Sequence, residues 1–364
     1  MQDRKAGNAL ARKVTLKEIA REAGLSISAV SLVLNNRPNR VSEKNRKLIR
    51  EIARKKRYVP NQIARSLVTK RSDTLGLIVP NITSRFFSSL ARELEIRARE
   101  LGYALFIVNS GGADGKDQDV ELFQLLLNRG VDGVFLVVSN EMSPDPQLTE
   151  AVSLSPVPCV MIDRALPDAR CDKVRFDSEL GGYLATRHLL ERGHRRIACV
   201  VNLRSYTGRE RLEGYKRALA EFSTFFDESL VFQSDYYIGE AYEVAARIVD
   251  SDVSAVFASS DNIALGVLKR LHGNGLRVPD DVSMVSYDNS AADALFEPAL
   301  TSIEQSVASL ARHALEMMAA RIREAEADED AAPTVDRVLP PQLVVHESTR
   351  DVSGDQGLTR YPFF

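Results

Sequence analysis

From Thr74 onward, short apolar runs alternate with longer amphipathic stretches, and this alternation constrains the fold more than any other feature of the sequence. The runs are rich in Val and Ile and apolar on both faces, as in parallel strands covered by helices. Between the first two runs, apolar residues recur at helical spacing from Phe87 to Leu101. The alternation predicts doubly wound α/β sheets with right-handed crossovers. The predicted strands are Leu75–Val79, Ala104–Val108, Val134–Val138, Cys159–Ile162, Ile197–Val201, Ala255–Ala258 and Val282–Val285.

The alternation continues to about residue 349, which is too long for one comfortable sheet and predicts two α/β subdomains. We expect the first sheet to end near Ile162 and the second to begin near Val174. The helical pattern Ala308–Ile322 is expected to return to the first sheet, and the run Gln342–Val345 to the second. The expected ligand-binding and dimerisation body, 74–349, thus divides into 74–162 with 290–322 and 163–289 with 323–349, followed by a tail, 350–364, without periodicity.

Charge is distributed unequally along the chain. The whole sequence of 364 residues has a net charge of −2. Residues 1–72, however, hold 19 Lys and Arg against 5 Asp and Glu, a balance of +14. The other 292 residues hold 29 basic and 45 acidic residues, a balance of −16. A basic head on an acidic body predicts that the head meets a polyanion.

Composition excludes several classes of protein. Hydrophobic residues make up 44% of the chain, which is enough for full-sized cores and excludes a disordered protein. Neither a membrane-spanning run nor the apolar stretch of a signal peptide is present. The three cysteines, Cys159, Cys171 and Cys199, are widely spaced and fit buried thiols in a reducing compartment. We therefore expect a cytoplasmic protein.

The basic head reads as three short helices over residues 14–58. Thr15 is a suitable N-cap for the first helix, and Gly24 provides the turn that follows it. Ser26 caps a second helix, whose inner face carries Ala29, Val30, Val33 and Leu34, and a third begins at Ser42. Two short helices joined by a glycine turn, plus a third, predict a helix-turn-helix DNA-binding domain. A plain three-helix bundle is the alternative, which the +14 charge disfavours.

The second helix of this motif enters the major groove with its N-terminal residues leading. The residues that face outward there are Ile27, Ser28, Ser31 and Leu32. Serine can bond a base edge or a phosphate, and Ile or Leu can touch a thymine methyl. Because no Arg, Asn or Gln occupies this face, affinity is expected to depend on phosphate contacts and to fall steeply with salt.

Residues 59–73 form a linker with its own short helical pattern, which begins at Pro60 and Asn61. Two turns are too few for a stable isolated helix, so this segment is expected to form only against a partner. Leu67 lies among basic residues, as an apolar wedge for a DNA minor groove would. Packing of Leu67 on the body is the other reading, and composition alone does not decide between them.

Polar residues follow several predicted strands, where open α/β sheets bind ligands. A sugar-like polyol needs carboxylate and amide acceptors, an arginine fork and an aromatic face. Asp288, Arg211, Asp261, Gln305 and Phe87 meet that need. Two of them have a structural alternative that remains open: Asp261 could cap a helix, and Arg211 could pair with a nearby carboxylate. Phe86 is more often a core residue than a pocket residue.

No pattern for catalysis or metal binding stands out. Ser110–Lys116 resembles a phosphate loop but lacks the required spacing of glycines and lysine. The five histidines are scattered, without the spacing of a zinc site. No nucleophile and base are paired along the sequence. We therefore expect no enzyme activity, no cofactor and no metal.

A set of motifs in colinear order resembles the LacI/GalR family of bacterial transcription regulators. The resemblance covers about residues 14–349 and is specific because of the order of the motifs rather than any single one. The motifs are Thr15–Asn35, Tyr58–Asn61, Ala64–Leu67, Gly76–Asn81, Arg192–Ile197, Arg211–Tyr215, Gly275–Val282, Ser286–Asn289, Pro298–Ile303 and Glu347–Thr349.

The resemblance implies a dimeric, ligand-responsive repressor on a pseudo-palindromic operator, with a sugar or related metabolite as effector and a carbohydrate-utilisation operon as target. It places Leu67 as the minor-groove wedge, while Leu32 departs from the Arg or His, and Ala29 from the Thr, often found there. The DNA-binding set is Thr15, Ser26, Ile27, Ser28, Ser31, Leu32, Asn35, Asn61, Ala64, Arg65 and Leu67. The effector-binding set is Phe86, Phe87, Arg164, Thr207, Arg211, Asp261, Asp288 and Gln305. A solute-binding carrier of the periplasmic type is the alternative, which the basic head and the missing signal peptide disfavour.

Overall fold

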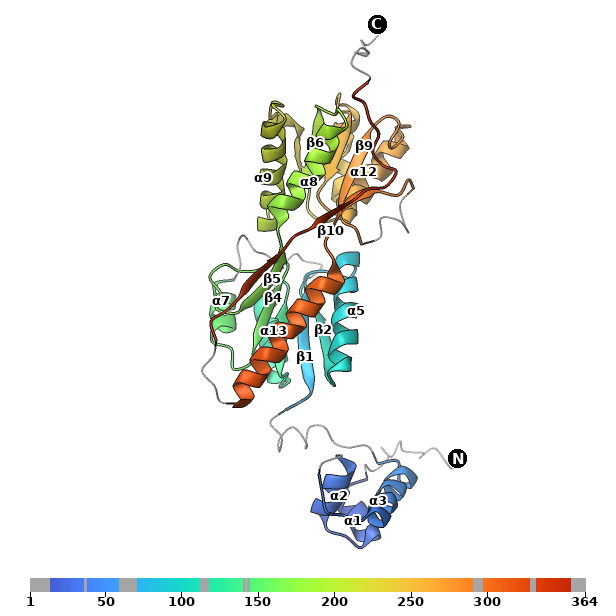
Figure 1. Cartoon of the computed structure of the whole chain (residues 1–364), viewed down its shortest axis with the longest axis vertical. Coiled ribbons are helices and arrows are strands. Elements are labelled where there is room, and N and C mark those ends of the chain that lie inside the picture. The colour runs from blue at the N-terminus through green and yellow to red at the C-terminus, as the bar shows by residue number, and fades with distance from the viewer. Residues whose placement is uncertain are drawn as a thin grey trace, which may run out of the picture. The chain divides into compact units, whose positions relative to one another are not determined.

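A computed structural model describes residues 14–35, 38–58, 71–111, 118–139, 142, 145–290, 297–327 and 332–354. The chain divides into two compact units, Met1–Ser72 and Asp73–Phe364 (Figure 1). In the described residues no helix is long and apolar enough to cross a membrane.

The described residues of the N-terminal unit form three helices, α1 (Leu16–Ala23), α2 (Ile27–Leu34) and α3 (Glu43–Lys55). All three predicted caps are confirmed, because the side chains of Thr15, Ser26 and Ser42 each accept a bond from a backbone N–H in the first turn. These bonds satisfy donors that a helix leaves open at its start, so the local sequence sets where each helix begins.

The turn between α1 and α2 depends on Gly24, whose φ of 65° lies in the left-handed region. The three helices bury one small core, in which Val30 and Val33 are the buried residues of α2. Ala29 and Leu34 are only half-buried, so the inner face of α2 is narrower than expected. The other buried core residues are Ile19, Ala20, Ile49, Ile52 and Ala53.

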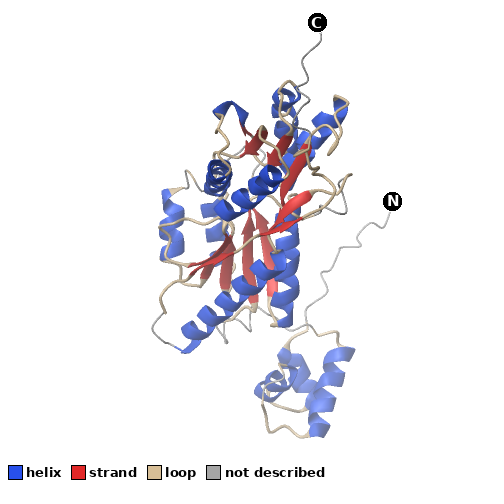
Figure 2. Ribbon diagram, turned by 45° about the horizontal axis from the view of Figure 1, so that its top comes forward, coloured by secondary structure: helices blue, strands red, loops and turns tan. Residues whose placement is uncertain are grey.

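The second unit contains two six-stranded sheets, which form two subdomains. The first sheet has the order β11-β5-β4-β3-β1-β2, and its strand pairs are all parallel. Helices α5 (Arg85–Glu100) and α13 (Val307–Ala327) pack on one face, and α6 (Asp119–Asn128) and α7 (Pro146–Ser153) on the other (Figure 2). Its strands are β1 (Thr74–Val79), β2 (Ala104–Asn109), β3 (Gly133–Leu136), β4 (Cys159–Ile162), β5 (Asp172–Phe176) and β11 (Asp336–Leu339).

The second sheet has the order β12-β10-β9-β8-β6-β7 and is parallel except for the pairing of β12 with β10. Helices α8 (Ser178–Glu191) and α9 (Tyr206–Glu221) cover one face. The other face is covered by α10 (Ile238–Val244), α11 (Ala246–Val249) and α12 (Asp261–Gly273). Its strands are β6 (Ile197–Val201), β7 (Val231–Gln233), β8 (Ala255–Ala258), β9 (Ser283–Asp288), β10 (Thr301–Glu304) and β12 (Gln342–Val344), and a short 3₁₀ helix, Glu228–Leu230, precedes β7.

The expected subdomain bounds are wrong in three places. Strand β5, expected to open the second sheet near Val174, pairs with β4 in the first. Strand β10 pairs with β9 in the second sheet, and β11 returns to the first. Both β5 and β11 begin with two charged residues and form no continuous apolar run, so the run-based signal did not place them correctly. The expected return of α13 to the first sheet and of Gln342–Val345 to the second is confirmed.

Candidate functional site

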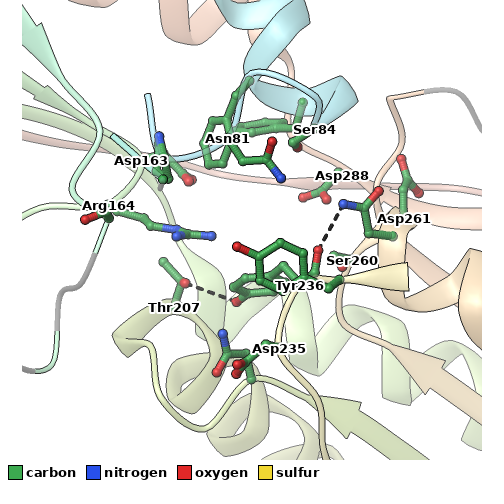
Figure 3. Close-up of a pocket in the computed structure, with 18 of the residues that line it drawn as sticks. Asn81, Ser84, Asp163, Arg164, Thr207, Asp235, Tyr236, Ser260, Asp261 and Asp288 are labelled. Carbon is green, nitrogen blue, oxygen red and sulfur yellow. Dashed lines mark hydrogen bonds between the residues drawn. The ribbon is translucent and has the colours of Figure 1, made fainter. Parts of the chain in front are cut away.

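A cavity of about 420 Å³ lies between the two subdomains, at the carboxyl ends of their strands (Figure 3). Residues that directly follow strands of the first sheet line one side, and those that follow strands of the second line the other. This is where open α/β sheets bind ligands. The lining residues are Pro80, Asn81, Ser84, Arg85, Phe86, Phe87, Ser110, Gly111, Ser139, Asp163, Arg164, Asn202, Arg204, Thr207, Arg211, Asp235, Tyr236, Tyr237, Ser260, Asp261, Asn262, Asp288 and Ser290.

Arg211 is held rigidly in this cavity by three partners. Its Nη1 donates to the carbonyl oxygen of Ser259 over 2.6 Å, and its Nη2 donates to Oε1 of Gln305 over 3.4 Å. The guanidinium carbon lies 3.7 Å from the centre of the Tyr287 ring. None of these three partners is a carboxylate, but Asp288 and Asp163 lie close enough to act on Arg211 electrostatically. Gln305 does not line the cavity but orients Arg211 from behind.

Asp288 ends β9 in a left-handed conformation, with a φ of 88°. Such strain in a residue other than glycine is characteristic of binding sites. Burial raises the pKa of the Asp288 carboxyl to about 7, with Arg211 opposing the rise and Asp261 and Asp163 adding to it. Near neutral pH this carboxyl therefore exists in both forms and can accept or donate a hydrogen bond.

Asp163, which directly follows β4, resembles Asp288 in its left-handed backbone conformation and in its raised pKa. Its φ is 63°, and burial raises the pKa of its carboxyl, although the neighbouring Arg164 and Arg211 oppose the rise. Carboxyl groups from both subdomains, together with Arg211 from the second, give the cavity the mixed polarity that a polyhydroxylated ligand requires.

Asp261 lines the cavity as the first residue of α12 rather than as its cap. The cap is Ser260, whose Oγ accepts a bond from the Ile263 N–H over 3.2 Å, so the capping alternative for Asp261 is wrong. The Asp261 carboxylate instead accepts bonds from the Ser286 and Ser290 hydroxyls, each over 2.7 Å. It thereby ties the start of α12 to the end of β9.

Arg164 lies between two aromatic rings that come from opposite sides of the cavity. Its guanidinium carbon is 5.4 Å from the Phe87 ring of α5 and 4.9 Å from the Tyr236 ring, which follows β7. Tyr236 is itself positioned by its hydroxyl, which lies 3.4 Å from Oγ1 of Thr207 (Figure 3). Arg164 therefore bridges the two subdomains. Phe86 is buried in the first core and also lines the cavity, so both readings of it hold.

Several lining residues are absent from the sequence-derived set. Asn202 directly follows the predicted strand Ile197–Val201, so the strand-end rule could have found it. Asp235, Tyr236 and Tyr237 follow β7, which has only three residues and gave no recognisable run. Asn262 follows Asp261 on α12, directly beside a residue that the sequence had selected.

The predicted DNA-reading residues of the N-terminal unit lie on α2 and beside it. Ile27 is 48% exposed and Ser28 is also exposed, whereas Ser31 and Leu32 are half-buried. Asn35 ends α2 and donates to the Ser31 carbonyl over 2.8 Å. The hydroxyls of Thr15 and Ser26 are the caps described above. Asn61, Ala64, Arg65 and Leu67 lie outside the described residues.

Comparisons with known proteins agree along nearly the whole chain. Residues 15–61 match the family described as "Bacterial regulatory proteins, lacI family", and residues 186–349 match the "Periplasmic binding protein-like domain". The "HTH-type transcriptional regulator DegA" of Bacillus subtilis (strain 168) is 32% identical over 341 residues, which is 93% of this chain and 98% of that protein.

Two solved structures extend the agreement. A "transcriptional regulator CelR-cellobiose complex" is 30% identical with a TM-score of 0.66 and covers 92% of this chain and 100% of its own. The "lac repressor dimer bound to operator and the anti-inducer ONPF" is 24% identical with a TM-score of 0.78 and covers 93% and 100%, which shows the fold. These relatives are transcription regulators and not enzymes.

Proposed function

Because this chain belongs to the LacI family of bacterial regulatory proteins and is a ligand-responsive DNA-binding transcription regulator, we propose that it represses a carbohydrate-utilisation operon in the cytoplasm. It binds a pseudo-palindromic operator as a dimer, and a sugar or related metabolite in the cavity releases or strengthens that binding.

The cavity chemistry carries the proposal. Arg211 presents a fixed guanidinium, Asp288 presents a carboxyl that can accept or donate, and Phe87 and Tyr236 offer aromatic faces. Sugars combine hydroxyls with apolar C–H faces, so they match both components. A cavity of about 420 Å³ also has room for a small saccharide. The bound cellobiose of the CelR relative supports the same class of ligand.

A dimer is supported by the edge of the first sheet. Phe106 and Ile107 on β2 are 44% and 42% exposed, and β2 pairs with only one strand, β1. Large apolar side chains on an open sheet edge favour association with another chain. A two-fold dimer carries two heads, which accounts for an operator with two related half-sites.

The response to effector follows from the bridge across the cavity. A ligand that separates Arg164 from Tyr236, or draws them closer, binds the open and closed forms of the body unequally. That difference in affinity is the coupling free energy available to change operator binding. The linker, which the sequence predicts to fold only against DNA and a partner, would transmit it.

The experiment is a thermal-shift screen of the full-length protein against sugars, sugar phosphates and nucleosides. DNA recovered from a random duplex pool is then titrated with and without each hit. We expect a sugar to stabilise the protein and to change its DNA affinity. Stabilisation by nucleosides alone would overturn the carbohydrate assignment, and a Leu67→Ala variant with undiminished specific DNA binding would remove the wedge.

A further inference from the structure

Cys159 and Cys171 are neighbours in the first sheet, whereas Cys199 lies in the second. Strand β4 begins at Cys159, and β5 begins one residue after Cys171. The two strands pair in parallel, with Val160 opposite Asp172. One step back along the same register, Cys159 stands opposite Cys171.

The two thiols also point to the same face of the sheet. Val160 and Ile162 of β4 and Val174 and Phe176 of β5 belong to the core under α5 and α13. Cys159 and Cys171 belong to the core on the other face. Successive side chains of a strand alternate between faces, so this division confirms the register for the cysteine pair.

The environment of the pair distinguishes its two sulfur atoms. The thiols hydrogen-bond to each other, which lowers the pKa of Cys171 and, together with burial, raises the pKa of Cys159. Lys173 lowers the pKa of Cys171 further. Cys171 therefore carries the greater thiolate character, and the thiolate is the reactive form. Both residues are 7% exposed, whereas Cys199 is 0% exposed and burial raises its pKa strongly.

We propose that Cys159 and Cys171 form an oxidisable dithiol that hydrogen peroxide converts into a disulfide. The Cys171 thiolate attacks one peroxide oxygen, the O–O bond breaks, and hydroxide leaves and takes up a proton as water, which gives a sulfenic acid. The Cys159 sulfur then attacks the Cys171 sulfur, and the S–O bond breaks with release of a second water. Two thiols and one peroxide thus become one disulfide and two waters.

The bond would join the amino-terminal ends of β4 and β5. It would close a ring of residues 159–171, which contains the rest of β4 and the loop 163–171. This loop begins with Asp163 and Arg164, which line the effector cavity, and it is followed by Asp172, whose carboxylate accepts two bonds of 2.8 Å from Arg321 of α13. A covalent link at Cys171 removes local openings of the loop in which the two strands separate. Oxidation would therefore restrain the loop from its Cys171 end.

The test uses the full-length protein. Native reduced protein is treated with hydrogen peroxide, quenched with catalase, and unfolded in an alkylating reagent, and intact mass counts the alkylated cysteines. Wild type is expected to fall from three alkylated cysteines to one, with no mass gain from oxygen, and a reductant restores three. Three alkylated cysteines, added oxygen atoms or a covalent dimer would overturn the proposal.

Cys199→Ser provides the matched control and is expected to fall from two alkylated cysteines to none. Cys171→Ser is expected to keep Cys159 reactive to alkylation after peroxide, and loss of Cys159 in that variant would contradict the pairing. Hydrogen exchange supplies the second readout. Peptides covering 163–171 are expected to exchange more slowly in oxidised than in reduced wild type, and unchanged exchange would refute the restraint of the loop.

Discussion

The N-terminal unit and the cavity differ in how far apart along the chain their bonded residues lie. Side chains that cap the helices of the N-terminal unit bond to near neighbours, whereas side chains of the cavity bond to distant residues. Thr15 exchanges bonds with Glu18, only three positions away. Arg211 bonds to Ser259 and Gln305, which are 48 and 94 positions away. A local bond forms with its own helix, whereas the distant bonds require α9 and the strands β8 and β10 to be assembled in the second sheet. A substitution at a helix cap of the head should therefore disturb only that helix, whereas a substitution in the cavity should disturb residues that are distant in the sequence.

The largest effect is expected for Arg211→Ala. Removal of the guanidinium leaves the Ser259 carbonyl and the Gln305 amide buried without their partner, which costs about 1–3 kcal/mol for each group. We expect effector affinity to fall about 100-fold, equivalent to about 3 kcal/mol, by calorimetric titration. Operator affinity without effector should stay within about twofold, because the head is a separate unit.

Arg217→Ala is the matched control for that variant. Arg217 lies on the same helix, α9, but its side chain is half-exposed and pairs with Glu179 on the surface. Surface ion pairs contribute little, about 0–1 kcal/mol. An Arg217 variant that loses effector binding as severely as the Arg211 variant would show that α9 itself, and not the cavity arginine, had been damaged.

Asp288→Asn tests the electrostatics of the cavity through pH. The pKa of Asp288 in the folded protein, about 7, lies above the ordinary aspartate value of 3.8, so the folded protein holds a proton that the unfolded chain has lost. The contribution of Asp288 to folding stability therefore falls as the pH rises from 3.8 to about 7, and it is constant above about pH 7. Relative to Asp288→Asn, wild type should lose about 2 kcal/mol between about pH 5 and pH 7 in urea unfolding.

The control for that pH effect is Asp280→Asn, whose side chain is 56% exposed. Its pH profile should run parallel to that of wild type. If Asp288→Asn also ran parallel to wild type, the raised pKa would be refuted and Asp288 would be an ordinary ionised carboxylate in the folded protein.

Thr15→Ala tests the local half of the comparison. It removes the hydroxyl that accepts a bond from the Glu18 N–H at the start of α1, which typically costs about 1 kcal/mol. We expect a lower unfolding midpoint of the head, measured by hydrogen exchange in α1. Effector binding should be unchanged. Lys17→Ala, on the exposed side of the same helix, should leave α1 unaltered. A loss of effector affinity in Thr15→Ala would contradict the separation of the two units.

The smallest effect is expected for His194→Gln. His194 lies near the Ser254 hydroxyl and the Arg350 carbonyl, and burial lowers its pKa to about 4. A lowered pKa favours the neutral form, so its contribution is present above about pH 6.5 and is lost as pH falls toward 4. Wild type should lose more stability than the variant on acidification, by less than about 1 kcal/mol. Equal losses would remove His194 as a titrating group.

The sequence predicted those elements whose physical cause is local or periodic. The strands β4, β6 and β8 match the predicted runs because an apolar run reports burial on both faces. Strand β5 was assigned to the wrong sheet and β11 was missed because both lie at one side of the first sheet and neither is a continuous apolar run. The subdomain bounds were misplaced for the same reason, since they depend on which sheet each strand joins.

The residues of the cavity likewise include some that the sequence predicted and others that only the structure revealed. The sequence by itself indicated the strand ends, and therefore Arg164, Asp261 and Asp288, because parallel strands bring their carboxyl ends to one edge. Only the tertiary structure decided that Ser260, not Asp261, caps α12, and that Gln305 supports Arg211 from behind. Only the tertiary structure brought Tyr236 against Arg164. The cap depended on which of two adjacent side chains turns back to the helix, and the Gln305 contact on how α9 and β10 lie in the second subdomain. The Arg164 contact depended on how the two sheets face each other, and no local pattern encodes these arrangements.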